Sequence, residues 1–307
     1  MSKISTAYKL LFHDRDAFML QMVETFSFLL PDKLYIMLFY RYKMGRPLDL
    51  NNPQRFTEKL QWLKLYNRNP LYTKLVDKET VKDYVSKKIG EDYIIPTLGV
   101  WNRFEDINFD ELPNKFVLKT TNGGGSIGVV ICKDKDNLDI TKAKLNLELG
   151  LKLNLYRKLR EWPYKGVKPR IIAEQMLEDA SGDLHDYKFY CFNGEPKFLL
   201  VSSDRFTNHN FNYFDLDFRK MDITSAMGAQ SSKLPEKPGN FDEMKEIAKK
   251  LCQGIPHVRI DLYSCNGDVY FGEMTFFDSS GYDNFCSDEL DLKFGEWLKL
   301  PEKQKFK

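Results

Sequence analysis

The sequence predicts an α+β protein whose sheet is largely antiparallel. Residues 187–202 and 257–277 each contain two strand-like runs around an Asn-Gly pair, at Asn193 and Asn266, and such a pair is a strong hairpin signal. A third observation is negative, since up to Gly90 no strand alternates with a helix. A doubly wound domain in this part of the chain is therefore not expected.

The composition is that of a globular chain with no strong overall charge. Of 307 residues, 42% are hydrophobic and 14% are aromatic, which is too many for wholesale disorder. Because 46 lysines and arginines face 44 acidic residues, no global field attracts nucleic acid. Five scattered cysteines without C-x-x-C spacing and four isolated histidines argue against a disulfide framework or a zinc site. We recognise no secretory signal and expect a protein of the reduced cytoplasm.

Residues 18–42 are expected to form two amphipathic helices separated by Pro31. Apolar residues recur at helical spacing on both sides of Pro31, but Glu24 and Arg41 interrupt the apolar stretch. The stretch falls short of the roughly 20 uninterrupted apolar residues that a membrane span needs. Packing on the main domain is the favoured use of these helices, and contact with a membrane surface is the alternative.

Two further helices are expected before residue 90, at 53–67 and 71–89, and Gly90 would end the second. Lys78 lies in this second helix. By position alone, we interpret Lys78 as surface charge, because the other lysines of the helix indicate a solvated face: Lys74, Lys82, Lys87 and Lys88.

After residue 94 the pattern changes to short strands and hairpins. Beyond the two hairpins, strands are predicted at 115–120, 127–132 and 171–177. Helices are predicted at 141–162 and 241–252, and a polar loop with a short aromatic run at 211–218 is predicted over 203–237.

The last hairpin carries two carboxylates whose relative placement depends on the turn. Because side chains alternate with a period of two, a two-residue turn starting at Asn266 would separate Asp261 from Glu273. A three-residue loop with its glycine left-handed would place both on one face, together with Arg259 and Thr275. Such a face suits Mg²⁺ shared with substrate phosphates, although a solvated face is commoner for a lone hairpin.

A glycine-rich segment separates the strands predicted at 115–120 and 127–132, and it consists of Gly123, Gly124, Gly125 and Ser126 after Asn122. Successive glycines indicate exposed backbone N–H groups or a mobile flap. No Gly-Lys-Ser/Thr follows and no helix begins, which excludes a P-loop and a dinucleotide fingerprint. We expect a hairpin that folds over phosphates, with Lys119 just outside it. A flexible surface loop is the alternative.

The strand predicted at 171–177 ends in the residues Glu174, Gln175, Met176 and Leu177. A strand end can leave backbone N–H and C=O groups available to a planar heterocycle, although most such ends are only turns.

On the following strand, Asp186 and Lys188 share a face and could approach a ligand from one side. A cross-strand ion pair is the simpler alternative. Arg170 and Arg205 are weaker candidates for contact with a ligand. No Ser/His/Asp or Cys/His arrangement stands out.

Four stretches, FTEKLQWLK, FVLKTTNGGGSIG, DYKFYCFNG and RIDLY with GEMTF, together resemble the TupA-like ATP-grasp proteins. The resemblance covers about residues 52–288, and this branch is associated with bacterial surface polysaccharides. It implies an ATP-grasp fold in which two α+β subdomains clamp a nucleotide. A helical segment at 1–70 would precede an ATP-grasp domain at 71–307, with a lid at about 93–170 and a core at about 171–307.

The resemblance also implies roles for the candidate residues. Lys78 and Lys119 would bind the phosphates of ATP beneath the glycine-rich segment. Adenine would meet the strand end that begins at Glu174, and Asp186 would meet the ribose. Lys188 would serve the phosphate, with Arg205 as a further catalytic candidate.

For the metal, the resemblance implies that Asp261 and Glu273 hold Mg²⁺ while Arg259 stabilises the transferred phosphoryl group. Thr275 stands where the superfamily usually has asparagine, so a water could replace it or one metal could bind weakly. The usual parallel-sheet domain ahead of the core is replaced by the helical segment 2–66.

The implied reaction is ATP- and Mg²⁺-dependent joining of a carboxylate to an amine through an acyl phosphate. The amine would come from an amino acid and the carboxylate from a uronic acid or peptide in surface-polymer synthesis. The reaction would take place in the cytoplasm, with the inner membrane surface as the alternative location. A phosphotransferase or glycosyltransferase using the same site is one alternative. A nucleotide-binding scaffold without turnover is another.

Overall fold

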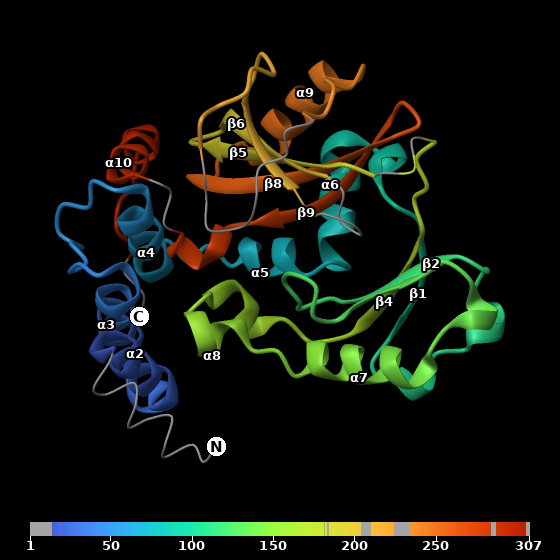
Figure 1. The fold of residues 1–307 in the computed structure, drawn as a ribbon, viewed down its shortest axis with the longest axis horizontal. Coiled ribbons are helices and arrows are strands. Elements are labelled where there is room, and N and C mark those ends of the chain that lie inside the picture. Colours follow the sequence, from blue (N-terminus) through green and yellow to red (C-terminus); the bar gives the residue numbers. More distant parts are fainter. Residues whose placement is uncertain are drawn as a thin grey trace. The chain divides into compact units, whose positions relative to one another are not determined.

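The structure, a computed structural model, describes residues 14–180, 182, 184–203, 210–223, 234–283 and 287–304 (Figure 1). The chain divides into two compact units. The first unit comprises residues 1–69, 154–162 and 277–307, and the second comprises residues 70–153 and 163–276.

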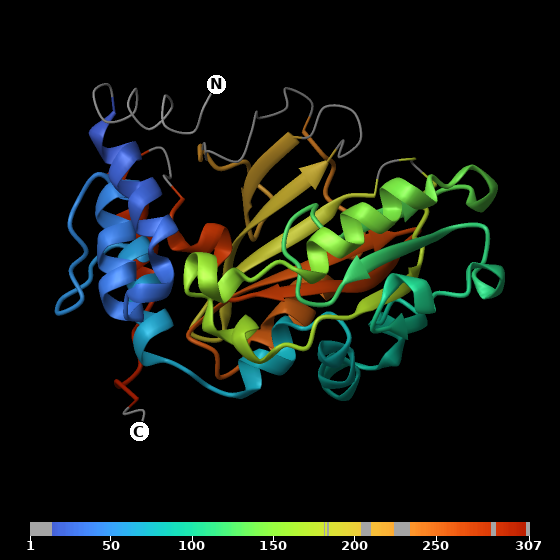
Figure 2. The ribbon, with the colours of Figure 1, turned by 90° about the horizontal axis from the view of Figure 1, so that it is seen from below.

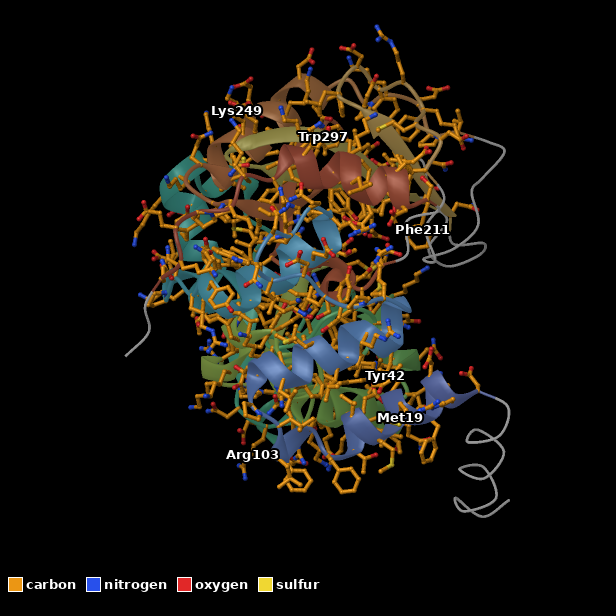
Figure 3. The ribbon with its side chains drawn as sticks, turned by 90° about the vertical axis from the view of Figure 1, so that its left-hand side faces the viewer. Met19, Tyr42, Arg103, Phe211, Lys249 and Trp297 are labelled. Carbon is orange, nitrogen blue, oxygen red and sulfur yellow. The ribbon has the colours of Figure 1, made fainter. Side chains whose placement is uncertain are left out.

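The first unit is helical. Its helices are α2 (Arg15–Thr25), η1 (Ser27–Leu29), α3 (Asp32–Met44), α4 (Phe56–Tyr66), α8 (Leu155–Leu159), η7 (Asp278–Gly281) and α10 (Asp288–Trp297). Figure 3 shows their side chains, with Met19 on α2, Tyr42 on α3 and Trp297 on α10. The two helices expected on either side of Pro31 are confirmed as α2 and α3. No helix in the described part of the chain is long and apolar enough to cross a membrane.

Helix α4 is held against α10 by polar contacts as well as by apolar packing. The backbone N–H and the hydroxyl of Thr57 donate to the buried Asp291 carboxylate over 2.9 and 2.7 Å. Phe56 meets Phe294 edge to face. Asp291 thus accepts from one of the first N–H groups of α4, which have no acceptor within the helix.

The second unit contains two antiparallel sheets. The four-stranded sheet has the order β1-β4-β2-β3 and the five-stranded sheet has the order β7-β6-β5-β8-β9. The strands are β1 (Thr97–Trp101), β2 (Phe116–Thr120), β3 (Val129–Cys132), β4 (Ile171–Gln175), β5 (Asp186–Phe192), β6 (Glu195–Ser203), β7 (Asn210–Asp215), β8 (His257–Cys265) and β9 (Asp268–Thr275). The α+β class with a largely antiparallel sheet is therefore confirmed.

The helices of the second unit pack on these sheets. They are α5 (Leu71–Val76), α6 (Thr80–Ile89), α7 (Ile140–Leu151) and α9 (Phe241–Cys252), with short turns η2 (Glu91–Tyr93), η3 (Phe104–Asp106), η4 (Phe109–Glu111) and η5 (Lys135–Asn137). Helix α7 covers one face of the four-stranded sheet and α9 covers one face of the five-stranded sheet (Figure 1). Figure 2 shows α7 in front of β2 and β3 when the molecule is seen from below.

Alternation along β2 separates a buried core face from a half-buried face. Phe116 and Leu118 are fully buried against Leu147 of α7 and Ala173 of β4. Lys119 points to the other side, as expected from the period of two. In the five-stranded sheet, Phe189 stacks on Phe241 of α9 and lies on the face opposite to the neighbouring polar residues.

The helix expected at 71–89 is wrong in one respect, because it is two helices. Asp77 separates α5 from α6, and its carboxylate accepts hydrogen bonds from the backbone N–H groups of Glu79 and Thr80 over 2.9 and 3.1 Å. Such capping ends one helix and starts the next. Lys78 therefore lies in the break between two helices and not on a helical face.

Other elements also differ from the expectations. The helix predicted at 141–162 is interrupted after Leu151, and Asn154 caps the short α8 by accepting from Arg157. The aromatic run within the expected polar loop forms strand β7, while 204–209 and 224–233 lie outside the described residues. The division into lid and core subdomains stays a prediction. The structure places β4, which begins at Ile171, in the four-stranded sheet.

Candidate functional site

Asp261 on β8 and Glu273 on β9 lie directly opposite each other, and so do Arg259 and Thr275. Of the two turns considered, the structure has the two-residue one, because Cys265 pairs with Asp268 and only Asn266 and Gly267, both left-handed, lie between them. The inference that such a turn separates the two carboxylates is wrong. A bulge supplies the missing residue. Leu262 pairs with Phe271 and Asp261 with Glu273, so Gly272 is extra and restores the common face.

The neighbouring strand β5 adds an aspartate and a lysine to this face. Lys188 lies opposite Asp261 in the sheet. Its ammonium donates to Oδ2 of Asp186 over 2.5 Å and to Oδ2 of Asp261 over 2.6 Å. The prediction that Asp186 and Lys188 share a face is therefore confirmed. Because Lys188 also contacts Asp261, the pair belongs to a larger cluster of charged side chains.

Arg259 joins both metal candidates. Its Nε donates to Asp261 Oδ1 over 2.7 Å, and its Nη2 lies 3.2 Å from both Glu273 Oε1 and the Thr275 hydroxyl. Because a buried charged side chain is stable only when it is paired, these contacts allow Arg259 and Asp261 to stay charged inside the protein.

Lys78 links this cluster to the glycine-rich segment. Its ammonium donates to the Gly123 carbonyl over 2.7 Å and to Glu273 Oε2 over 3.1 Å, and its backbone N–H donates to the Thr121 carbonyl. Only 15% of the side chain is exposed. Surface charge, the interpretation from position alone, is therefore wrong, because the break at Asp77 turns Lys78 inward.

The cluster contains three acidic and three basic side chains, namely Asp186, Asp261, Glu273, Lys78, Lys188 and Arg259. Burial raises the pKa of Asp261, although Arg259 and Lys188 oppose this. Burial alone would raise the pKa of Glu273 too, yet Lys78, Arg259 and Lys188 hold it well below its usual range. Glu273 is thus ionised at neutral pH, as a metal ligand must be.

The glycine-rich segment connects β2 to β3, and helix α7 anchors both of its ends. Asn122 donates to the carbonyls of Gly150 and Leu153 over 3.2 and 3.0 Å. A Cβ on Gly123 would lie 2.7 Å from the Thr120 hydroxyl, so only glycine fits there. Beyond Gly123 the segment is solvent-facing, with Gly125 left-handed and exposed.

On the four-stranded sheet, Lys119 and Glu174 form an ion pair of 2.6 Å. A second lysine, Lys82 of α6, lies 2.5 Å from the same carboxylate. The expectation of a solvated face for Lys82 is wrong, because only 14% of its side chain is exposed and its ammonium pairs with Glu174.

The family model for the TupA-like ATP-grasp proteins matches residues 58–299. The chain belongs to the TupA-like ATP-grasp family. No curated protein is found that matches it.

Among solved structures, this TupA-like protein is similar to the D-alanine–D-alanine ligase from Bacillus anthracis, with 19% identity over 66% of this chain and 57% of that chain at a TM-score of 0.40. The ligase of the same name from Helicobacter pylori is 15% identical over 80% and 70%, with a TM-score of 0.41. The L-amino acid ligase from Bacillus licheniformis is 14% identical over 88% and 57%, with a TM-score of 0.40. The chain thus matches little more than half of the first of these enzymes.

At the end of β4, where contact with adenine is expected, one backbone group of this TupA-like protein is already hydrogen-bonded. The backbone N–H of Gln175 donates to the Pro96 carbonyl over 3.0 Å, so this group is not left for a heterocycle. Met176 and Leu177 follow the strand and are half-buried. Contact of the nucleotide with Met176 and Leu177 stays a prediction. Arg205 lies outside the described residues.

Asp261, Glu273 and Thr275 offer the oxygen donors that Mg²⁺ prefers. Mg²⁺ is usually held by one or two carboxylates and completes its shell with water and substrate phosphates. The two opposed carboxylates of the TupA-like protein fit this pattern. In the described part of the chain, no set of three or more acidic, cysteine or histidine side chains forms a ready-made metal cage. A metal bound there would take its remaining ligands from water and substrate phosphates.

Proposed function

We propose that the chain is an ATP- and Mg²⁺-dependent ligase that joins a carboxylate to an amine. The observation that carries this proposal is that Lys78 donates both to the Gly123 carbonyl of the glycine-rich segment and to Glu273 of the β8–β9 hairpin. One cation beside a glycine-rich hairpin and a carboxylate pair suits a nucleotide whose terminal phosphate is transferred. Membership of the family supports the same reaction class.

In the proposed reaction, a substrate carboxylate oxygen attacks the γ-phosphorus of ATP, and the bond to the β-γ bridging oxygen breaks to release ADP. The amine nitrogen then attacks the carbonyl carbon of the acyl phosphate. Phosphate leaves, the amine loses a proton and an amide remains. Phosphoryl transfer needs positioning and charge stabilisation more than covalent help.

Four cations would do this work. Lys78 and Lys119 would hold the phosphates, Lys188 would bring charge from β5, and Arg259 would stabilise the transferred phosphoryl group. When bound on Asp261 and Glu273, Mg²⁺ would neutralise phosphate oxygens. The present salt bridges would then exchange carboxylate partners for phosphate, which keeps every buried charge paired.

The second part of the proposal concerns the two substrates that are joined. We infer an amino acid as the amine donor and a uronic-acid or peptide carboxylate as the acceptor, in surface-polysaccharide synthesis, because the family is associated with such polymers. A cytoplasmic location follows from the use of ATP as substrate.

The test is a screen of amino acids against uronic-acid and peptide acceptors, with ADP release and product mass as readouts. We expect ADP and phosphate only when amine and carboxylate are both present, and a product whose mass is the sum of both minus water. ADP release with a phosphorylated or glycosylated product would instead support a transferase. ATP binding without turnover under every condition would reduce the chain to a nucleotide-binding protein.

A further inference from the structure

The buried carboxylate of Glu174 has a lysine on each of its oxygens. Lys82 Nζ lies 2.5 Å from Oε1, and Lys119 Nζ lies 2.6 Å from Oε2. Glu174 itself is only 5% exposed. One lysine would be enough to neutralise this carboxylate, so the second one requires an explanation.

The two lysines differ in how fully their ammonium groups are satisfied. Lys82 has three acceptors, because it also donates to the Ile95 carbonyl and the Thr97 hydroxyl, each over 2.8 Å. An ammonium has three N–H donors, so Lys82 is saturated and fixed. Lys119 has a single acceptor among the described residues, Glu174. Lys119 therefore keeps two donors for another anion.

The position of Lys82 suits a fixed role. It lies one helical turn after Lys78 on α6, whose start is fixed by the Asp77 cap. Lys78, just before α6, and Lys82, in its first turn, thus contact different sheets of the second unit. Lys78 contacts Glu273 of the β8–β9 hairpin, and Lys82 contacts Glu174 of β4.

We propose that Lys82 is a positioning residue for a nucleoside triphosphate: it keeps Glu174 neutralised, so that Lys119 can leave this carboxylate and bind phosphate oxygens. The inference rests on the proposed function, because it assumes that ATP binds beside Lys119. It assigns the two lysines different roles, with Lys119 mobile and Lys82 stationary.

The physical reason is the unfavourable free energy of an unpaired buried carboxylate. Without Lys82, movement of Lys119 would leave the buried Glu174 carboxylate without a cation. Lys119 would therefore stay beside Glu174 unless Glu174 took up a proton. Burial alone would raise the pKa of Glu174, yet Lys119 and Lys82 hold it below its ordinary value. The other charged or titratable groups that act on the two lysines are Glu79, Tyr263 and Glu273.

The first test compares Lys82→Met, Lys82→Arg and a matched control, Lys87→Met, by calorimetric binding of Mg–ATP and of adenosine. Lys87 is on the same helix and its side chain is 71% exposed. We expect Lys82→Met to weaken ATP binding about tenfold or more, the size of one lost charged hydrogen bond, and to leave adenosine nearly unchanged. Lys82→Arg should recover most of the loss, and Lys87→Met should match the wild type.

Two further readouts separate positioning from a structural role. The defect of Lys82→Met, relative to wild type at the same pH, should be smaller at pH 6 than at pH 8.5, because protonation of Glu174 replaces the missing cation. In a Glu174→Gln background, Lys82→Met should have almost no effect, since no carboxylate then needs neutralising.

The inference is overturned if Lys82→Met binds ATP like the Lys87 control, or if it weakens ATP and adenosine equally and does so in the Glu174→Gln background too. A wild-type chain that binds no ATP would overturn the proposed function, and this inference with it. A wild-type chain that binds ATP while Lys82→Met is silent would overturn the inference alone.

Discussion

Asp261 and Glu273 face each other across β8 and β9 only because Gly272 is bulged out of the ladder between them and the turn. The two-residue turn by itself would put the carboxylates on opposite faces of the sheet. The bulge thus decides whether the two side chains can bind one cation. Bulges next to functional sites commonly re-aim a side chain in this way.

We expect Gly272→Ala to disturb this pairing. A Cβ at this position would lie 3.1 Å from the Asp261 carbonyl oxygen, which belongs to the backbone and cannot turn aside. The free energy of unfolding in urea should fall by about 1–3 kcal/mol, as for other overpacked sites, and the rate of ADP release should fall with it. Gly239→Ala is the control, because nothing lies within 4 Å of its added methyl group. Equal stability and activity of the two variants would contradict the role of the bulge.

Local patterns predicted much of this fold. Helix α9 has the expected bounds, and the Asn-Gly pairs lie at the turns of both expected hairpins. The period of two correctly placed Asp186 with Lys188 and turned Lys119 away from the core. These features depend on residues that are close in sequence, where sterics and alternation suffice.

The remaining features depend on partners that are distant in sequence. The contact of Lys82 with Glu174 could be recognised only from the structure, because the expected single helix is broken at Asp77, just before α6. The bulge at Gly272 is a property of the pairing between two strands, and the single glycine within β9 indicates only a place where a bulge can form. The aromatic run that became β7 pairs with β6, and without that partner it reads as a loop. In such cases the strand is determined by its partner strand and by burial more than by the local propensity of its residues.

Glu273→Gln should leave the fold intact and remove most turnover. The change keeps the shape but removes the charge that faces Lys78 and Arg259 and that would help to hold Mg²⁺. We expect a fall in the rate of ADP release of about 100-fold or more, in the range seen when one preorganised electrostatic group is removed. Titration of Mg²⁺ at saturating ATP should show a higher requirement for the metal.

Asp268→Asn is the matched control for this variant, since Asp268 lies on the same hairpin and is exposed. It should keep wild-type activity and metal dependence. Full activity in Glu273→Gln, with an unchanged melting temperature, would refute the metal assignment.

Asn146→Ala should loosen the glycine-rich segment without unfolding the sheet. The Asn146 amide accepts from the Gly128 backbone N–H over 3.1 Å and donates to the Val129 carbonyl over 2.7 Å, which fixes the segment to α7. Loss of both bonds removes about 1–2 kcal/mol of local stability. Hydrogen exchange of residues 121–128 should become faster and the KM for ATP should rise. Asn137→Ala, at an exposed position, should change neither quantity, and unchanged exchange in Asn146→Ala would show that α7 does not anchor the segment.

In the first unit, Lys64→Met should be strongly destabilising although it removes no residue of the candidate site. Lys64 is fully buried on α4, and its ammonium donates to the carbonyls of Leu159 and Ser280 and to the Ser280 hydroxyl. Burial lowers the pKa of Lys64 and raises the pKa of the buried Glu161, while the attraction between the two charges opposes both shifts. Without the ammonium, two carbonyls and a hydroxyl lose their donor and the buried Glu161 loses an attractive charge, so the free energy of unfolding should fall by about 3 kcal/mol or more.

The measurement is urea denaturation of Lys64→Met, of Glu161→Gln and of the double variant. The double variant should be more stable than Lys64→Met, because no buried carboxylate is then left alone. Lys43→Met on α3 is the control, since Lys43 is exposed and its loss should change the free energy of unfolding by less than about 0.5 kcal/mol. If Lys64→Met behaved like this control, or if the double variant were the least stable of the three, the two buried groups would not be stabilising each other.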